Sequence, residues 1–179
     1  MWNDFCDLKR YISYKTIQMK KLIFAAALLL IGVGANAQTP GQFKAGVNIG
    51  LPVGDVADVA SFTAGADLAY LWNISENFQL GPTAGFQNYF IKSELKDLGA
   101  ENVNFVPVAA SGQYSIVPNF FIGADLGYAF VTSGGGDGGF YYMPKLGYQQ
   151  PSYEVYGGYR GVSNDGSISA INLGVNFKF

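Results

Sequence analysis

The stretch Ile171-Asn-Leu-Gly-Val-Asn-Phe-Lys-Phe179 decides the fold class. Its odd positions carry apolar side chains, and its even positions carry Asn, Gly or Lys. Because successive side chains of a β-strand point to opposite faces, this pattern predicts a strand with one apolar face and one polar face. The chain ends directly on this strand, as we expect of a strand that closes a barrel in a membrane.

The same alternation recurs through the preceding chain. It predicts eight strands of about 9 to 13 residues, close to the roughly 9 to 11 residues of a transmembrane strand. The expected strands are 43–51, 61–72, 78–90, 104–114, 119–131, 140–148, 153–161 and 167–179. The phase is expected to slip near Asn88 and Phe105, and three prolines inside strands, Pro82, Pro107 and Pro144, would need bulges in a barrel without edges.

The connections between these strands alternate in length. Short turns are expected at 73–77, 115–119 and 149–152, and longer segments at 52–60, 91–103, 132–139 and 162–166. Short turns at one rim and longer loops at the other are typical of an antiparallel up-and-down barrel of the bacterial outer membrane. The longer segments hold most of the acidic residues, and Lys92 to Gly99 is expected to form a short helical turn.

Aromatic residues indicate which face points outward, since a soluble eight-stranded ligand carrier has the same alternation with its apolar face inside. In the up-and-down order, one rim is expected to carry Phe43, Trp72, Phe78, Tyr114, Phe120, Tyr148, Tyr153 and Phe179, and the other Phe62, Phe130, Phe140 and Tyr159. Aromatic belts at two levels of an outer wall are typical of a protein in a bilayer. The pattern therefore favours an apolar face toward lipid.

The beginning of the sequence predicts export. Met19-Lys20-Lys21 precedes an uncharged apolar run and the small-x-small site that ends at Ala37, so 19–37 reads as a signal peptide cleaved between Ala37 and Gln38. The run is shorter than the roughly 20 residues that a helix needs to span a bilayer. Residues 1–18 are interpreted as an N-terminal extension, consistent with a start codon placed too early.

The composition of the expected mature chain, 38–179, excludes several functions. It has six Lys and Arg residues and eleven Asp and Glu residues, so its formal net charge of −5 gives no general attraction for nucleic acid. His is absent, and the single cysteine, Cys6, precedes the signal peptide. Common nucleophile and base pairs are therefore not available, and we expect neither an enzyme nor a cofactor or metal site.

The export signal, the eight amphipathic strands and the terminal Phe179 together resemble the small outer-membrane protein β-barrel family of Gram-negative bacteria. The resemblance covers nearly all of 38–179 and implies a transmembrane barrel located in the cell outer membrane. It also implies contact with outer-membrane lipid and lipopolysaccharide. Val175, Phe177 and Phe179 resemble the C-terminal signal that such proteins present to the barrel-assembly machinery.

Charged residues on the inward face are the candidate functional residues. If Phe130 faced Phe140, Asp125 would lie directly opposite Lys145 in the lumen, as a buried ion pair or as part of a polar relay. The other residues expected to face inward are Lys44, Asp67, Glu154, Arg160 and Lys178. The expected function is a structural or surface-interaction role with a lumen filled by side chains. The alternatives are a narrow conduit for small apolar molecules and a secreted soluble carrier.

Overall fold

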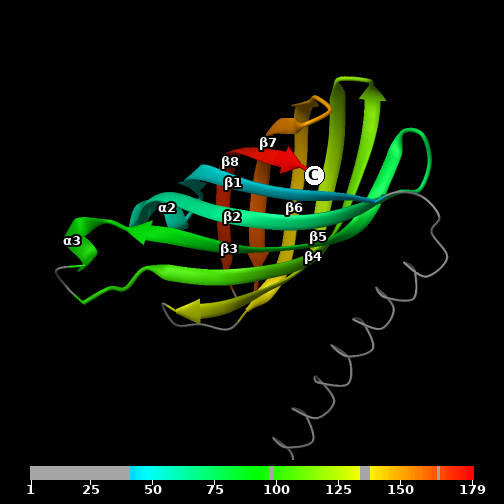
Figure 1. The fold of residues 1–179 in the computed structure, drawn as a ribbon. Helices are drawn as coiled ribbons and strands as arrows, with labels where there is room; N and C mark the ends of the chain where they lie inside the picture. Colours follow the sequence, from blue (N-terminus) through cyan, green and yellow to red (C-terminus); the bar gives the residue numbers. More distant parts are fainter. Residues whose placement is uncertain (1–40, 97–98, 134–137, 165) are drawn as a thin grey trace, which may run out of the picture. The chain divides into compact units, whose positions relative to one another are not determined.

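The computed structural model describes residues 41–96, 99–133, 138–164 and 166–179. They form one closed barrel of eight antiparallel strands, in which each strand pairs with the next and β8 pairs with β1 (Figure 1). The strands are β1 (Gly41–Val53), β2 (Ala60–Asn73), β3 (Phe78–Ile91), β4 (Val103–Val117), β5 (Phe120–Ser133), β6 (Gly139–Gln149), β7 (Tyr153–Ser163) and β8 (Ser167–Lys178). The predicted up-and-down barrel is confirmed, and the strand boundaries lie within three residues of the expected ones.

The predicted N-terminal features cannot be placed in this fold. The extension 1–18, the signal peptide 19–37 and the cleavage site between Ala37 and Gln38 lie outside the described residues. They remain predictions from the sequence.

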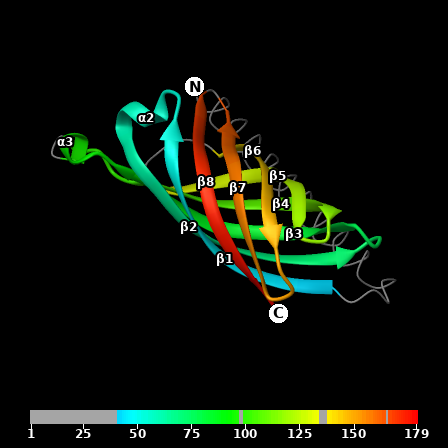
Figure 2. The ribbon, with the colours of Figure 1, turned by 90° about the horizontal axis from the view of Figure 1, so that it is seen from above.

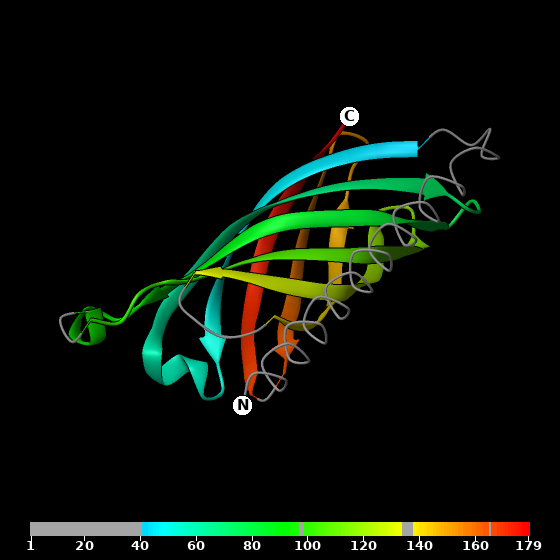
Figure 3. The ribbon, with the colours of Figure 1, turned by 90° about the horizontal axis from the view of Figure 1, so that it is seen from below.

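The two ends of the barrel differ as predicted. One end, here called the turn end, carries the short connections 74–77, 118–119 and 150–152, and the other, the loop end, carries 54–59, 92–102, 134–138 and 164–166. Two short helices, α2 (Val56–Val59) and α3 (Ser93–Lys96), lie at the loop end (Figures 2 and 3). α3 falls inside the predicted helical segment, whereas α2 was not predicted. Within the described residues, no helix has the length and hydropathy needed to cross a bilayer.

The apolar face of the strands points outward. Phe120, Leu126 and Leu173 are 54%, 53% and 59% exposed, whereas the neighbouring Asp125 is buried at 5%. A soluble carrier would show the reverse, because its apolar face lines the interior. The predicted orientation is therefore confirmed: the apolar side chains form the outer wall of the barrel, and the charged ones face the lumen.

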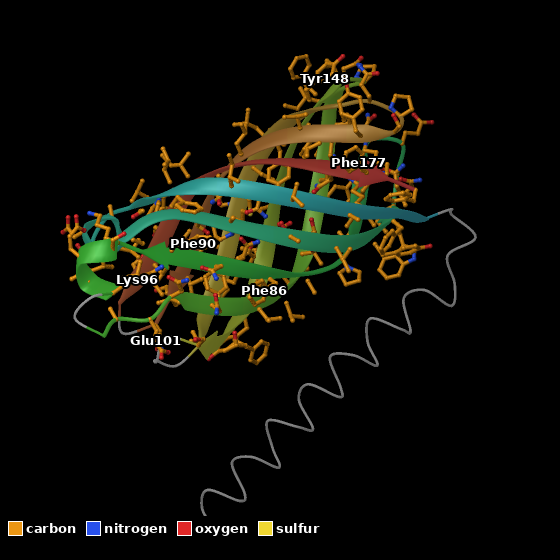
Figure 4. The ribbon with its side chains drawn as sticks, turned by 60° about the vertical axis from the view of Figure 1, so that its left-hand side comes forward. Phe86, Phe90, Lys96, Glu101, Tyr148 and Phe177 are labelled. Carbon is orange, nitrogen blue, oxygen red and sulfur yellow. The ribbon has the colours of Figure 1, made fainter. Side chains whose placement is uncertain are left out.

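Exposed aromatic side chains stand near both ends of this wall. Tyr148 and Phe177 lie near the turn end, away from Lys96 and Glu101, which lie with α3 at the loop end (Figure 4). The outward-facing residues near the loop end include Phe62, Phe130, Phe140 and Tyr159, all more than a third exposed. This distribution agrees with the two aromatic levels expected from the sequence.

The alternation continues through β3, contrary to the prediction of a slip near Asn88. Gln87, Tyr89 and Ile91 are all buried on the inward face, so Asn88 is a polar residue on an outward row that keeps its phase. Asn88 therefore marks no change of phase within β3, although the pairing of β2 with β3 does shift nearby, where Ala60 and Phe62 lie opposite Ile91 and Phe90. The irregularity predicted near Phe105 is present, because the pairing of β4 with β5 shifts between Asn104 and Phe105.

The strand prolines are accommodated by gaps in the hydrogen-bonded ladder rather than by bulges. The pairing of β2 with β3 passes over Pro82, that of β3 with β4 passes over Pro107, and that of β6 with β7 passes over Pro144. Each proline keeps its pairing on the other side, where Pro82, for example, lies opposite Ala110. A residue in an antiparallel strand directs its N–H toward one neighbour only, so a missing N–H interrupts one ladder and leaves the other intact.

Candidate functional site

The inward faces of the eight strands form the lumen, which holds the charged residues predicted from the sequence. Four of these are cationic and three are anionic: Lys44, Lys145, Arg160 and Lys178, and Asp67, Asp125 and Glu154. They come from six strands and gather in three groups at successive levels between the turn end and the loop end. An isolated charge in such an interior is costly, so each charged side chain needs a partner. The partners in the three groups are described in turn.

The group nearest the turn end is centred on Glu154 of β7. Its carboxylate lies 2.8 Å from Lys44 Nζ and 3.6 Å from Lys178 Nζ, and its second oxygen accepts a 2.8 Å hydrogen bond from Asn176. Lys44 also donates to Gln113 of β4 at 2.7 Å. Strands β1, β4, β7 and β8 are thereby linked across the lumen, and the one carboxylate serves two ammonium groups.

The middle group is the ion pair between Asp125 of β5 and Lys145 of β6. Lys145 Nζ donates to both carboxylate oxygens of Asp125, at 2.8 and 2.9 Å, and lies 3.4 Å from Ser111 Oγ. The ammonium also lies 5.8 Å from the ring centroid of Tyr156, within the range of a cation–π contact. The ammonium of Lys145 is therefore contacted from three strands, β4, β5 and β7.

The predicted register of this pair is wrong by two residues. Asp125 lies opposite Met143, Lys145 lies opposite Gly123, and Phe140 pairs with Tyr128 rather than with Phe130. The ion pair forms because the long side chain of Lys145 reaches diagonally over Gly123, which has no side chain in the way. Diagonal neighbours on one face of a sheet are within reach of such side chains.

The third group joins Asp67 of β2 to Arg160 of β7 through two amides. Asn48 donates to Asp67 Oδ2 at 2.5 Å, and Gln87 donates to Asp67 Oδ1 at 3.1 Å. Arg160 in turn donates from Nη2 to Asn48 at 3.1 Å and from Nη1 to Gln87 at 2.7 Å. The four side chains form a closed ring of hydrogen bonds, and Arg160 Nη1 also donates to Asn172 at 3.0 Å.

Sequence reasoning identified the charged members of these groups but missed the amides between them. The signal was present, since Asn48, Gln87, Gln113, Asn172 and Asn176 all occupy inward positions of their strands. Polar residues on a lumen face must find partners, so each inward Asn or Gln could have been included in the candidate network.

Apolar side chains fill the lumen toward its two ends. Tyr89, Phe105 and Tyr141 are buried at the loop-end side of Arg160, and Leu71 and Phe121 are buried toward the turn end. Between the charged groups near the turn end, the described residues enclose a space of about 20 Å³, which is about the volume that one water centre requires. The described side chains therefore leave no wide aqueous path along the axis.

The predicted assembly signal lies on the outward face of β8. Phe177 and Phe179 are 53% and 75% exposed, and Val175 belongs to the same outward row. The backbone N–H of Phe179 donates to the carbonyl of Phe43 at 2.9 Å, which fixes the end of the chain against β1. The terminal ring is thus accessible although its backbone is anchored.

Among the described residues, no group of three or more His, Cys, Asp and Glu side chains is placed to hold a metal ion. The carboxylates of the lumen are each engaged with cations or amides of the protein.

Solved structures of small outer-membrane barrels have a similar fold. The barrel is similar to the attachment invasion locus protein Ail of Yersinia pestis, with a TM-score of 0.53 and 16% identity, covering 80% of this chain and 100% of that one. The described residues have the fold of the small outer-membrane β-barrels. The N-terminal β-barrel domain of Pseudomonas aeruginosa OprF matches with a TM-score of 0.50 and 13% identity, covering 79% of this chain and 100% of that domain.

A designed protein shares the fold as well. A de novo transmembrane β-barrel matches with a TM-score of 0.53 and 15% identity, covering 79% of this chain and 98% of that one. No protein-family model matches the chain, and no curated protein matches it. At these identities the likeness concerns the fold, and function has to be argued from the site.

Proposed function

We propose that this chain is an integral outer-membrane protein without enzymatic activity, which supports the envelope or presents its loops to partners. Its outward apolar wall and its resemblance to small outer-membrane barrels support the location. The observation that carries the proposal is the lumen closed by its own side chains, where three charged groups lie between apolar layers. Such an interior serves stability rather than transport.

Single-channel recording on the purified barrel tests this function. We expect no steady open conductance, because ions would have to pass the buried ring around Arg160 and the aromatic side chains beside it. A long-lived open level in planar bilayers would contradict the proposal. Heat-modifiable migration on a gel provides the control that the barrel in the recording is folded.

The partners follow from the same proposal. Outer-membrane lipid and lipopolysaccharide contact the wall, and the barrel-assembly machinery recognises the outward row Val175, Phe177 and Phe179 during biogenesis. The loop end offers α2 and α3 for contact with other molecules. The attachment and invasion in the name of Ail belong to that protein, since likeness of fold does not carry an activity.

The second candidate function is a narrow conduit for small apolar molecules that leave sideways through the wall. One observation favours it: the ladder between β6 and β7 is interrupted at Pro144, and the adjacent Lys145 lines the enclosed space of the lumen. Uptake of small apolar compounds by cells that produce the Asp125→Ala variant separates the two functions. Removal of the carboxylate frees Lys145 and would change uptake through a conduit, whereas a structural barrel would show no change.

A further inference from the structure

The outer wall of the barrel is hollowed on one side. A groove of about 1200 Å³ crosses the outward faces of β6, β7 and β8, which lie side by side in Figure 2, and reaches β5 on one flank and β1 and β2 on the other. The apolar side chains along it include Leu51, Phe62, Ile122, Leu146, Ile171 and Leu173. Its floor is backbone, because β7 places Gly157 and Gly158 at the middle of the groove.

Gly157 accounts for the depth of this groove. Its position belongs to the outward row of β7, and it lies between Leu146 of β6 and Leu173 of β8, which are 67% and 59% exposed. A Cβ added at Gly157 would meet only a backbone oxygen, at 3.9 Å, so the space in front of it is open. The missing side chain leaves a notch between two projecting leucines.

The charged and amide side chains that line the groove are engaged inside the barrel. Lys145 contributes to the lining, but its ammonium is held by both oxygens of Asp125 inside the barrel. Asn172 also contributes, and its amide donates to the carbonyl of Ala170 and accepts from Arg160. The hydroxyl of Tyr159 is the other polar group of the lining, so an occupant meets no free charge and burial of apolar surface is its main attraction.

The groove is long as well as apolar. It extends from Leu51 and Phe62, in the loop-end halves of β1 and β2, to Ile122 and Leu146, in the turn-end halves of β5 and β6. This elongated, uncharged depression is continuous with the apolar outward wall of the barrel. An extended hydrocarbon chain lying against the wall matches this shape and chemistry.

We propose that the groove over Gly157 binds one acyl chain of a membrane lipid. The proposal rests on the proposed function, since it needs the wall to face a bilayer. The hydrocarbon, rather than the headgroup, is the recognised part, because the polar atoms of Lys145 and Asn172 are engaged inside the barrel.

Lipid retention measured by native mass spectrometry tests the proposal. The protein is expressed from the full sequence, purified from outer membranes in detergent, and loaded with phosphatidylcholine or phosphatidylglycerol that carry the same acyl chains. Gly157→Phe places a ring in the notch and is expected to lower the retained lipid at least about tenfold, the change that corresponds to about 1.4 kcal/mol. Gly157→Leu, a smaller filler, serves if the first variant folds poorly.

Ala84→Phe is the matched control. Ala84 lies on the outward row of β3, away from the groove, and its neighbours Leu68 and Val108 are 54% and 45% exposed. This variant adds the same ring between two apolar neighbours and is expected to retain lipid like the parent. Equal retention by the Gly157 and Ala84 variants would overturn the proposal.

Three other results would also overturn it. Retention that follows the headgroup at constant acyl chain would show that the hydrocarbon is not the recognised part. A dimer that the Gly157 variants abolish would assign the groove to a second copy of the chain. Release of the folded protein from cells without detergent would instead overturn the membrane location itself, and the groove proposal with it.

Discussion

Asp67 and Arg160 are joined by two side-chain amides that bridge each oxygen of the carboxylate to one terminal nitrogen of the guanidinium. Asn48 forms one bridge and Gln87 the other. Four strands, β1, β2, β3 and β7, therefore meet in one ring of hydrogen bonds inside the barrel. Since both charges are buried or partly buried, the ring spreads each charge over neutral dipoles and ties distant parts of the sequence together.

Removal of Arg160 should destabilise the barrel strongly. Arg160→Met leaves Asp67 and two amides without their cation, and we expect a loss of roughly 3 to 5 kcal/mol in the free energy of unfolding. Urea unfolding in lipid vesicles, followed by heat-modifiable migration, measures this loss. In the double variant with Asp67→Asn the losses should not add, with a coupling of about 0.5 to 3 kcal/mol. Additive losses would show that the ring does not act as a unit.

Glu154 should contribute more to stability than Lys178. Glu154→Gln keeps the shape but leaves Lys44 and Lys178 without their shared carboxylate, so we expect a loss of roughly 3 to 5 kcal/mol. Lys178→Met should lower the free energy of unfolding less. The ammonium that it removes lies 3.6 Å from the carboxylate, and Lys44 remains at 2.8 Å. Unfolding midpoints of the two variants provide the comparison, and equal losses would contradict the central place of Glu154.

Gly81 should not tolerate a side chain. A Cβ at this position would lie 1.9 Å from the backbone oxygen of Tyr70 on β2, and backbone cannot move aside as a flexible side chain can. Gly81→Ala is therefore expected to lower the free energy of unfolding by about 1 to 3 kcal/mol. Gly166→Ala is the control, because a Cβ there has none of the described atoms within 4 Å, and the change in unfolding free energy should remain within about 0.5 kcal/mol.

Phe179 should affect assembly more than stability. Its ring is 75% exposed and lies 6.1 Å from that of Phe43, so Phe179→Ala removes little packing and should change the unfolding free energy by less than about 1 kcal/mol. The amount of folded barrel in the outer membrane of growing cells should nevertheless fall. Comparison of this yield with refolding of the purified chain in vesicles separates the two effects. A variant that assembles normally in cells would refute the role of Phe179 as a signal.

Much of this fold could be predicted because strand periodicity is a local property. Alternating residues in 171–179 and in the earlier strands place each side chain on a face without any knowledge of its partners. The composition of the two faces then indicated that lipid, rather than water, covers the apolar one. The same local logic failed at Asn88, where one polar residue on an outward row was interpreted as a slip of phase.

The sequence alone determined that Lys44, Asp67, Asp125, Glu154, Arg160 and the remaining inward lysines face the lumen. Only the tertiary structure decided their partners, because these depend on the register between strands and on closure of β8 onto β1. Asp125 meets Lys145 diagonally, and Asp67 meets Arg160 through amides of two other strands. Alternation fixes the face of a side chain within its own strand, whereas contacts across a lumen are set by the shear of the whole barrel.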